Sequence, residues 1–399
     1  MDKKPEKLVP EVRFKGFTDD WEQHKLGEVV SVFDGTHQTP NYKTKGIMFL
    51  SVENINTLLS NKYISENEYR QRFKIKPQYL DVFMTRIGTI GKTNVITTHK
   101  PIAYYVSLAL LRPQNIQSFF LSFIIQTSKV QQDIWKRTLQ IAFPQKINKD
   151  EIGKVTLALP LQKEQIDIEK LLLKLDKLIT LQQRKLEQLK QLKKAMLQQL
   201  FVNKNNKQPN LRFKNFNGDW EERKLSDIAN YRNGKAHEQY IDMNGIYTVV
   251  NSKFISTNGK VKKFSNEPIE LLKKGEIAFV LSDVPNGKAL AKAYLIDSDN
   301  KYSLNQRIAG ISPSSDINSY FLYVLMNRNR YFLKFDDGVG QTNLSKKDIE
   351  EFKENYPLFD EQQKIANLFS QIQTLISLQQ NKHTQLIALK KYLLQKLFI

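Results

Sequence analysis

Apolar residues recur at alternating steps of three and four along two segments of the chain that contain neither glycine nor proline. The first segment lies between Pro160 and Pro209, and the second follows Pro357. This spacing is typical of a long amphipathic helix, so we predict helices over 163–201 and 360–398. The periodic positions are Ile168, Leu172, Leu175, Ile179, Leu186, Leu189, Met196 and Leu200 in the first segment, and Ile365, Phe369, Ile372, Ile376, Leu386, Leu393 and Leu397 in the second.

A second apolar row widens the stripe on each predicted helix, which favours packing of the two helices on each other. This row comprises Leu171, Leu178, Leu192, Leu368, Leu375 and Leu389. If the helices run antiparallel, their midpoints cross, so Gln182 and Gln379 should face each other and fix the register. The alternative is that both amides point to solvent, because a period of about 3.6 residues lets the seam drift.

The two halves of the chain are copies of one sequence repeat. Residues 10–29, PEVRFKGFTDDWEQHKLGEV, return as residues 209–228, PNLRFKNFNGDWEERKLSDI, with an offset of 199 positions from Trp21 to Trp220. The two predicted helices align without a gap, from Pro160 to Phe201 and from Pro357 to Phe398. Antiparallel pairing would relate the repeats by a pseudo-twofold axis.

The stretches outside the predicted helices have the composition of globular domains. Residues 12–158 and 211–355 are rich in aromatic and β-branched residues and contain turn signals such as Asn233-Gly234. We therefore predict two globular domains, each followed by a long helix. The expected boundaries are 1–158, 159–203, 204–355 and 356–399, with a polar linker at 203–208 between the halves.

The charge of the chain indicates a polyanionic partner. There are 61 Lys and Arg against 41 Asp and Glu, so the net charge is +20. Generic basicity is the alternative. The chain has no cysteine, which excludes disulfides, thiolate catalysis and cysteine-based zinc sites and fits a reducing cytoplasm. No signal-peptide core and no run of about 18 apolar residues is present, so we expect a cytoplasmic protein with no membrane partner.

The sequence contains no complete catalytic motif of the kinds that follow. Residues 88–93, GTIGKT, end like a phosphate-binding loop, but Arg86 stands where the first glycine is required. No Asn-Pro-Pro-aromatic or Asp-Pro-Pro-aromatic tetrapeptide occurs, which argues against an amino-methyltransferase site. The five histidines lack metal-ligand spacing. The sequence therefore predicts binding without catalysis, with no metal and no cofactor in this chain.

Two divergent globular domains, each followed by a long helix entered through Pro-Leu-x-x-Glu-Gln at Pro160 and at Pro357, resemble the specificity subunit of a type I restriction-modification system. The likeness spans the chain and includes residues 33–40, FDGTHQTP, residues 233–237, NGKAH, and Gly-x-Ile-Gly-Lys at 88–92. The second copy departs from the last motif with DVPNGK at 283–288.

The resemblance implies an α+β fold with two mixed α/β target-recognition domains, each followed by a long spacer helix, the two helices being paired as an antiparallel coiled coil with an internal pseudo-twofold repeat. It also implies a non-catalytic DNA specificity subunit whose two target-recognition domains each read one half of a split, asymmetric sequence in double-stranded DNA. It implies that the helices dock two modification (methyltransferase) subunits, which use S-adenosylmethionine. It also leaves room for two restriction (nuclease/translocase) subunits, which use ATP and Mg²⁺.

Specific reading of DNA would come from polar side chains on the domain loops, because Asn and Gln pair with adenine and Arg and Lys with guanine in the major groove. For each residue alone, a phosphate contact or a solvated loop position is the alternative. Residues 143–145 and 341–343 are weaker candidates. The candidates are Thr36, His37, Gln38, Asn41, Tyr42, Lys43, Arg86 and Lys92 in the first domain, and Lys235, His237, Asn251, Lys253 and Lys288 in the second.

Other functions stay open at this point. They are a stand-alone DNA-binding or anti-restriction decoy protein, the recognition part of a split adenine methyltransferase, a complete methyltransferase, a coiled-coil scaffold and a general RNA-binding protein. A methyl-transfer assay on the isolated chain separates the methyltransferase from the specificity subunit. Competition between duplex DNA and RNA separates the RNA-binding protein.

Overall fold

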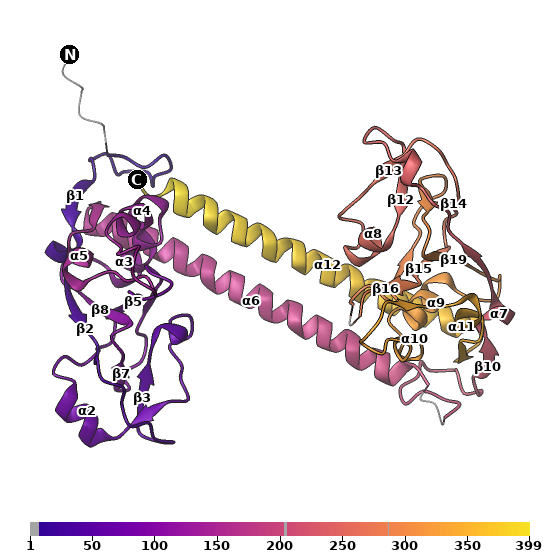
Figure 1. Cartoon of the computed structure of the whole chain (residues 1–399), viewed down its shortest axis with the longest axis horizontal. Coiled ribbons are helices and arrows are strands. Elements are labelled where there is room, and N and C mark those ends of the chain that lie inside the picture. The colour runs from indigo at the N-terminus through magenta and orange to yellow at the C-terminus, as the bar shows by residue number, and fades with distance from the viewer. Residues whose placement is uncertain (1–7, 203–205, 286) are drawn as a thin grey trace, which may run out of the picture. The chain divides into compact units, whose positions relative to one another are not determined.

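The computed structural model describes residues 8–202, 206–285 and 287–399. It divides into two compact units, Met1–Arg184 with Asn381–Ile399 (unit 1) and Lys185–Gln380 (unit 2). The predicted boundary between 203 and 204 lies outside the described residues. Each unit takes one part of both long helices, α6 (Gln162–Leu200) and α12 (Phe359–Lys396), which Figure 1 labels. Both predicted helices are therefore present, with ends within two residues of those expected.

In unit 1 an antiparallel sheet of order β2-β8-β5-β6 packs against helices, and a smaller sheet of order β4-β3-β7 lies beside it. Strands β3 and β7 run parallel. The short strand β1 pairs with β9 and so closes the domain where the helix α6 begins. The elements are β1 (Glu22–Lys25), α1 (Leu26–Val29), β2 (Val30–Asp34), β3 (Ile47–Leu50), η1 (Val52–Asn54), β4 (Tyr63–Ile64), α2 (Glu66–Arg72), β5 (Val82–Thr85), β6 (Thr93–Val95), β7 (Ile102–Tyr104), β8 (Leu108–Pro113), α3 (Ser118–Ile125), α4 (Ser128–Lys136), α5 (Lys149–Gly153) and β9 (Thr156–Leu159).

Unit 2 repeats this plan, with a sheet of order β11-β19-β15-β17, a smaller sheet of order β13-β12-β18-β14 and the closing pair β10 and β21. An additional pair, β16 and β20, joins two loops. The elements are β10 (Glu221–Lys224), α7 (Leu225–Ile228), β11 (Ala229–Asn233), η2 (Glu238–Tyr240), β12 (Tyr247–Val250), α8 (Ser252–Ser256), β13 (Phe264–Ser265), β14 (Leu271–Leu272), β15 (Ile277–Val280), β16 (Ser282–Asp283), β17 (Ala293–Leu295), β18 (Tyr302–Leu304), β19 (Ile308–Pro313), α9 (Ser319–Met326), α10 (Arg330–Leu333), β20 (Thr342–Asn343), α11 (Lys346–Glu350) and β21 (Lys353–Tyr356).

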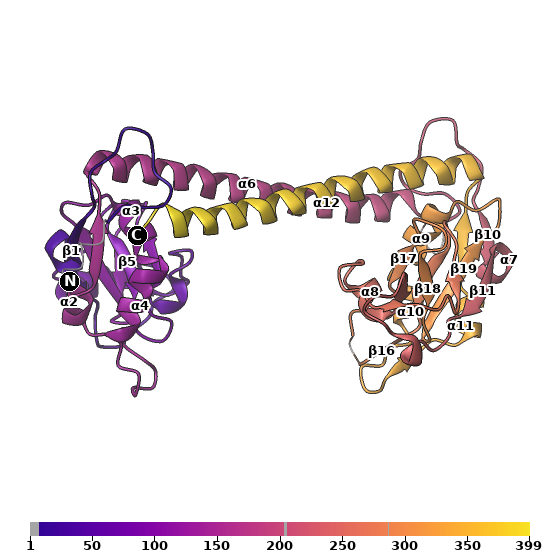
Figure 2. The same ribbon diagram turned by 90° about the horizontal axis from the view of Figure 1, so that it is seen from above.

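The long helices run antiparallel, as predicted (Figure 2). In unit 1 the first part of α6 packs against the last part of α12, where Lys390 Nζ lies 2.6 Å from Asp176 Oδ1. In unit 2 the last part of α6 packs against the first part of α12, where Phe201 lies 5.8 Å from Phe369 between ring centroids. The pseudo-twofold repeat expected from the sequence is thus the plan of the fold.

The repeated tryptophan of each unit receives the aromatic residue that closes a long helix. Phe398 lies 6.2 Å from Trp21, and Phe201 lies 6.3 Å from Trp220, both as edge-on ring pairs. Such aromatic pairs add about 0.5–1.5 kcal/mol beyond the area that they bury. The core of unit 1 therefore includes the C-terminal end of α12, and the core of unit 2 includes the C-terminal end of α6.

The repeated Glu-Gln after each helix-entry proline is buried and fastens the helix to its unit. Glu164 accepts both guanidinium hydrogen bonds of Arg13 at 2.8 Å, and Gln165 donates to the carbonyl of Pro160 at 2.9 Å. In unit 2, Arg212 donates to Glu361 in the same two-pronged manner at 2.8 and 2.7 Å. A buried carboxylate is tolerated because both oxygens are paired with charged donors.

Candidate nucleic-acid interface

Four segments of unit 1 are joined by backbone hydrogen bonds into one surface, here called loop cluster 1 (residues 35–38, 86–92, 105–107 and 139–146). Thr36 pairs with Tyr105 in a parallel bridge. The amide of Arg86 donates to the carbonyl of Ser107 at 3.0 Å, and the amide of Gly88 donates to the carbonyl of Gln145 at 2.8 Å. The segment 143–145, which the sequence ranked low, therefore lies beside the glycine turn.

Arg86 does not reach this surface. Its side chain is only 7% exposed, and it donates to the carboxylate of Asp34 and, at 3.2 Å, to the carbonyl of Ile147. The prediction that Arg86 contacts a base or phosphate was wrong, because the guanidinium is used inside the domain. Arg86 instead joins the ends of three segments of loop cluster 1 and is a positioning residue.

The exposed candidates of unit 1 fall into two groups. His37, Gln38 and Lys92 lie on loop cluster 1, and the half-buried Thr36 hydroxyl accepts from the amide of Gln38 at 3.3 Å. Lys92 and Thr89 line a hollow together with residues of η1. The positive φ of Gly88 (75°) and Gly91 (83°) shapes the turn that presents Lys92.

Asn41, Tyr42 and Lys43 form the second group. All three are exposed, but Lys43 pairs with Tyr63, so these residues follow the smaller sheet and are not joined to the glycine turn. The Nζ of Lys62 lies 5.5 Å above the ring of Tyr42. The sequence placed both groups in one set, and the fold separates them.

Unit 2 repeats the four-segment arrangement as loop cluster 2 (residues 234–238, 281–285 with 287–288, 305–307 and 336–343). Lys235 pairs with Asn305 in a parallel bridge, as Thr36 does with Tyr105. Ser282 pairs with Asn343 in the β16–β20 ladder, and Gln341 Nε2 donates to Ser282 Oγ at 2.7 Å. The loop at 88–92 and the described residues of the divergent loop in the second copy, 283–285 and 287–288, thus occupy matching places.

His237 lies inside unit 2 and cannot contact a ligand on loop cluster 2. It is 1% exposed, its Nδ1 donates to the carbonyl of Lys235 at 2.7 Å, and its Nε2 lies 2.7 Å from Ser303 Oγ. Because a carbonyl oxygen only accepts, Nδ1 carries the proton. The prediction for His237 was therefore wrong, and the imidazole is a structural brace.

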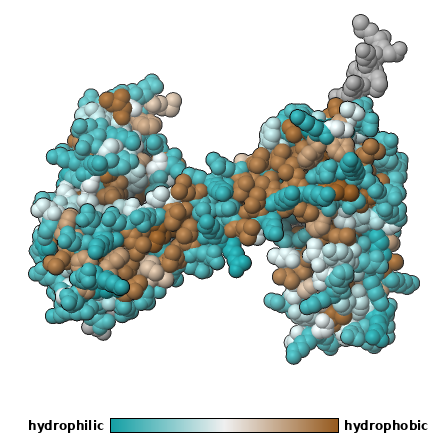
Figure 3. All heavy atoms as spheres, turned by 180° about the vertical axis from the view of Figure 1, so that it is seen from behind, coloured by the Kyte–Doolittle hydropathy of each residue, from teal (hydrophilic) through white to brown (hydrophobic). Residues whose placement is uncertain are grey.

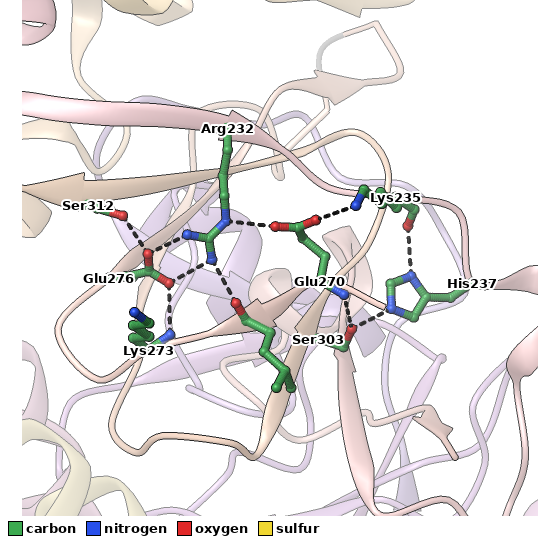
Figure 4. A network of polar contacts seen from close by, with 9 residues as sticks. Arg232, Lys235, His237, Glu270, Lys273, Glu276, Ser303 and Ser312 are labelled. Atoms are coloured by element: carbon green, nitrogen blue, oxygen red, sulfur yellow. Dashed lines mark hydrogen bonds and ion pairs between the residues drawn. The ribbon is translucent and has the colours of Figure 1, made fainter. Parts of the chain in front are cut away.

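A polar network behind loop cluster 2 supports the segment after β11 that carries Lys235 and His237 (Figure 4). Arg232 donates to both oxygens of Glu276 at 2.5 and 2.8 Å. Glu270 forms an ion pair with Lys235, in which Oε2 lies 3.0 Å from Nζ. Burial alone would raise the pKa of Glu276, but the hydrogen bonds from Arg232 and Ser312 hold it below its ordinary value. Glu276 is thus a charged structural anchor.

The remaining candidates of unit 2 surround a second hollow. Asn251 Oδ1 caps α8 by accepting from the amide of Phe254 at 2.9 Å, and Asn251 and Lys253 line the hollow with Gln306 and Arg307. Lys288 is exposed on loop cluster 2. Gln306 and Arg307 were missed by the sequence reasoning. They lie in the three-residue connection 305–307 between β18 and β19, and no sequence signal singled them out.

Apolar side chains are also exposed on the long helices (Figure 3). The second apolar row was expected to widen the packing stripe, but several of its members face outward, because the paired helix covers only part of each circumference. The exposed apolar residues are Leu178, Leu181, Ile387, Leu389 and Tyr392 in unit 1 and Leu192, Phe359, Leu375 and Leu378 in unit 2.

The described part of the chain has no metal-binding cluster and no membrane-spanning helix. Residues 8–202, 206–285 and 287–399 contain no group of three or more His, Asp or Glu placed to hold a metal ion. No helix among them combines the length and apolar character needed to cross a membrane.

The model of the type I restriction modification DNA specificity domain matches this chain twice, over residues 18–191 and 217–388. The chain belongs to this family. Each match covers one globular copy and most of the long helix that follows it, so the chain is a specificity subunit with two target-recognition domains.

Individual relatives agree with this assignment. The chain is 22% identical over 408 aligned residues to a protein assigned as the type I restriction enzyme MjaX specificity subunit of Methanocaldococcus jannaschii, covering 95% of this chain and 93% of that one. Its fold is similar to the crystal structure of the type I restriction-modification S subunit from M. genitalium, with a TM-score of 0.66, 15% identity and coverage of 98% and 99%. A chain from a structural study of complex assembly and conformational transition in the type I R-M system gives a TM-score of 0.55 with 12% identity and coverage of 98% of both chains.

Proposed function

We propose that each loop cluster reads one half of a bipartite, asymmetric sequence in double-stranded DNA. The observation that carries this proposal is that one backbone arrangement of four joined segments recurs with different exposed side chains. Loop cluster 1 presents His37, Gln38 and Lys92, whereas loop cluster 2 presents Lys235 and Gln341 at related places. A shared frame with different amides and cations suits two different base sequences.

Affinity that does not depend on sequence would come from the excess of cations. The net charge of +20 favours contacts to phosphates, which release counterions and make binding weaken steeply as salt rises. Exposed lysines of the two domains, such as Lys43, Lys253 and Lys288, would supply such contacts. Base pairs between the two half-sites would then be spanned without being read.

We further propose that the exposed apolar residues of the long helices dock two modification subunits, one on each unit. Leu178 and Leu375 occupy equivalent positions of the repeat and are exposed in both units, as are Leu181 and Leu378. Contiguous exposed apolar rows mark surfaces that a partner covers. Methyl transfer from S-adenosylmethionine would take place in those subunits in the cytoplasm, and this chain would be non-catalytic.

Methylome sequencing of cells with and without the gene tests the proposal. We expect one split adenine motif to disappear with the gene and to return with a plasmid copy. The purified chain should bind duplex DNA in preference to RNA of matched length. An unchanged methylome, or methylation or cleavage by the purified chain alone, would contradict the proposed function.

A further inference from the structure

Loop cluster 1 ends in an apolar tip. Ile141 and Phe143 are 102% and 104% exposed, which is the exposure of a side chain with no neighbour at all, and Leu139 at the base of the tip is 45% exposed. Large apolar side chains in this state are unfavourable in water, so they indicate a surface that another molecule covers.

The base of the tip is fixed to the segments proposed to read DNA. Leu139 and Lys146 pair across the loop, and Lys146 also pairs with Ile87. The amide of Gly88 donates to the carbonyl of Gln145, and the amide of Ile147 donates to the carbonyl of Arg86 at 3.0 Å. The tip therefore projects from the same frame as the glycine turn and Lys92.

The second copy has a smaller apolar tip at the matching place. Val339 is 85% exposed on the segment 336–343, and Val284 is 63% exposed on the segment to which it is paired. Apolar exposure at this place is therefore a feature of both repeats. The aromatic ring is particular to the first, which fits loops that face two different half-sites.

We propose that the tip formed by Ile141 and Phe143 contacts bases of the first half-site directly, with the ring of Phe143 packed on an apolar base surface. This inference rests on the proposed function. DNA is the occupant that fits, because the exposed Lys92 and Lys146 flank the tip and would bring it to a phosphate backbone. The apolar surfaces that DNA offers are the thymine methyl group in the major groove and the face of an unstacked base.

The test uses the full chain assembled with its modification subunits and a duplex that carries the motif found by methylome sequencing. Phe143→Ala should weaken binding to the cognate duplex on the order of tenfold and leave binding to a duplex with a scrambled first half-site nearly unchanged. The slope of log affinity against log salt should stay the same, because an apolar contact releases no counterions. Lys92→Ala should instead lower that slope by about one.

Leu59→Ala is the matched control, since Leu59 is 68% exposed in the same unit but lies outside loop cluster 1. Phe143→Leu should restore part of the lost affinity. Replacing thymines by deoxyuridine identifies a methyl contact when the resulting loss vanishes in the Phe143→Ala variant. An increase in 2-aminopurine fluorescence that occurs with the parent chain but not with Phe143→Ala identifies an unstacked base. Either result supports the proposal.

Cognate binding by Phe143→Ala with the affinity of the parent chain would overturn the proposal. So would a variant that binds DNA normally and fails only to retain its modification subunits, because the tip would then contact protein. If the parent assembly itself does not distinguish cognate from scrambled DNA, the proposed function has failed before the tip is tested.

Discussion

Lys193 on α6 donates from Nζ to Gln373 Oε1 on α12 at 2.7 Å. The equivalent pair in the other repeat is Lys390 with Asp176, an ion pair of 2.6 Å. A neutral amide thus stands in unit 2 where unit 1 has a carboxylate. Burial lowers the pKa of Lys193, because desolvation disfavours the charged ammonium and no neighbouring anion offsets it.

Gln373→Asp should therefore stabilise unit 2, by about 0.5–1 kcal/mol at pH 7. In the parent chain the folded pKa of Lys193 lies below the ordinary value of 10.5, so its charge is unfavourable below the folded pKa and the penalty disappears as the pH rises toward 10.5. The variant should consequently gain stability at pH 7 and lose its advantage near pH 11, which urea unfolding at both values measures. Asp176→Asn should show the opposite sign in unit 1. A Gln373→Asp gain that persists at pH 11 would contradict the electrostatic explanation.

Arg86→Ala should loosen loop cluster 1 without removing a phosphate contact. The guanidinium joins Asp34 to the carbonyl of Ile147, so its loss leaves two acceptors unpaired and should lower stability on the order of 2 kcal/mol. We expect faster amide exchange in 87–92 and 139–147, and weaker reading of one half-site with an unchanged salt slope. A salt slope lowered by about one would restore Arg86 as a phosphate contact.

A feature of this fold could be predicted from the sequence when the interacting residues lie close together along the chain, and could not when they lie far apart. The long helices were predictable because periodicity and the lack of glycine and proline are local properties. The partners of Glu164 and Glu361 were not, since Arg13 and Arg212 lie about 150 residues away, although both arginines fall within the repeated RFK. His37 and His237 stand in similar turns, yet only His237 meets a serine, Ser303, that holds it inside.

Arg212→Ala should be among the most damaging single changes to unit 2. It would leave the carboxylate of Glu361, which is 1% exposed, without its two-pronged partner, and breaking such a pair costs about 3–5 kcal/mol. Urea unfolding measures the loss. The double variant Arg212→Met with Glu361→Leu should recover most of it, because apolar replacement removes both charges together. If the double variant is as unstable as the single one, the effect lies in packing.

Exchange of residues 30–147 for those of a relative should change one half of the recognised sequence and leave the other half intact. Residues 30–147 are exchanged and not the whole domain, 12–158, because the domain also contains Arg13 and Trp21. Arg13 donates to Glu164, and Trp21 packs against Phe398. Keeping β1, β9 and these contacts preserves the support of the domain while the reading loops change. Methylome sequencing of cells with the exchanged gene gives the result, and a change in both half-sites would contradict modular reading.

Gln182 and Gln379 lie near the midpoints of the long helices. The side-chain oxygens of Gln182 and Gln379 are both buried and accept no hydrogen bond. We predict that the two amides face each other across the helix pair, where rotation of one amide by a half-turn lets its nitrogen donate to the other oxygen. Each single change to Leu should then cost about 1 kcal/mol by leaving the remaining amide unpaired, whereas the double change should be at least as stable as the parent. A double-mutant cycle measured by urea unfolding decides the matter. Additive effects within about 0.5 kcal/mol, as for independent sites, would show that the amides do not meet.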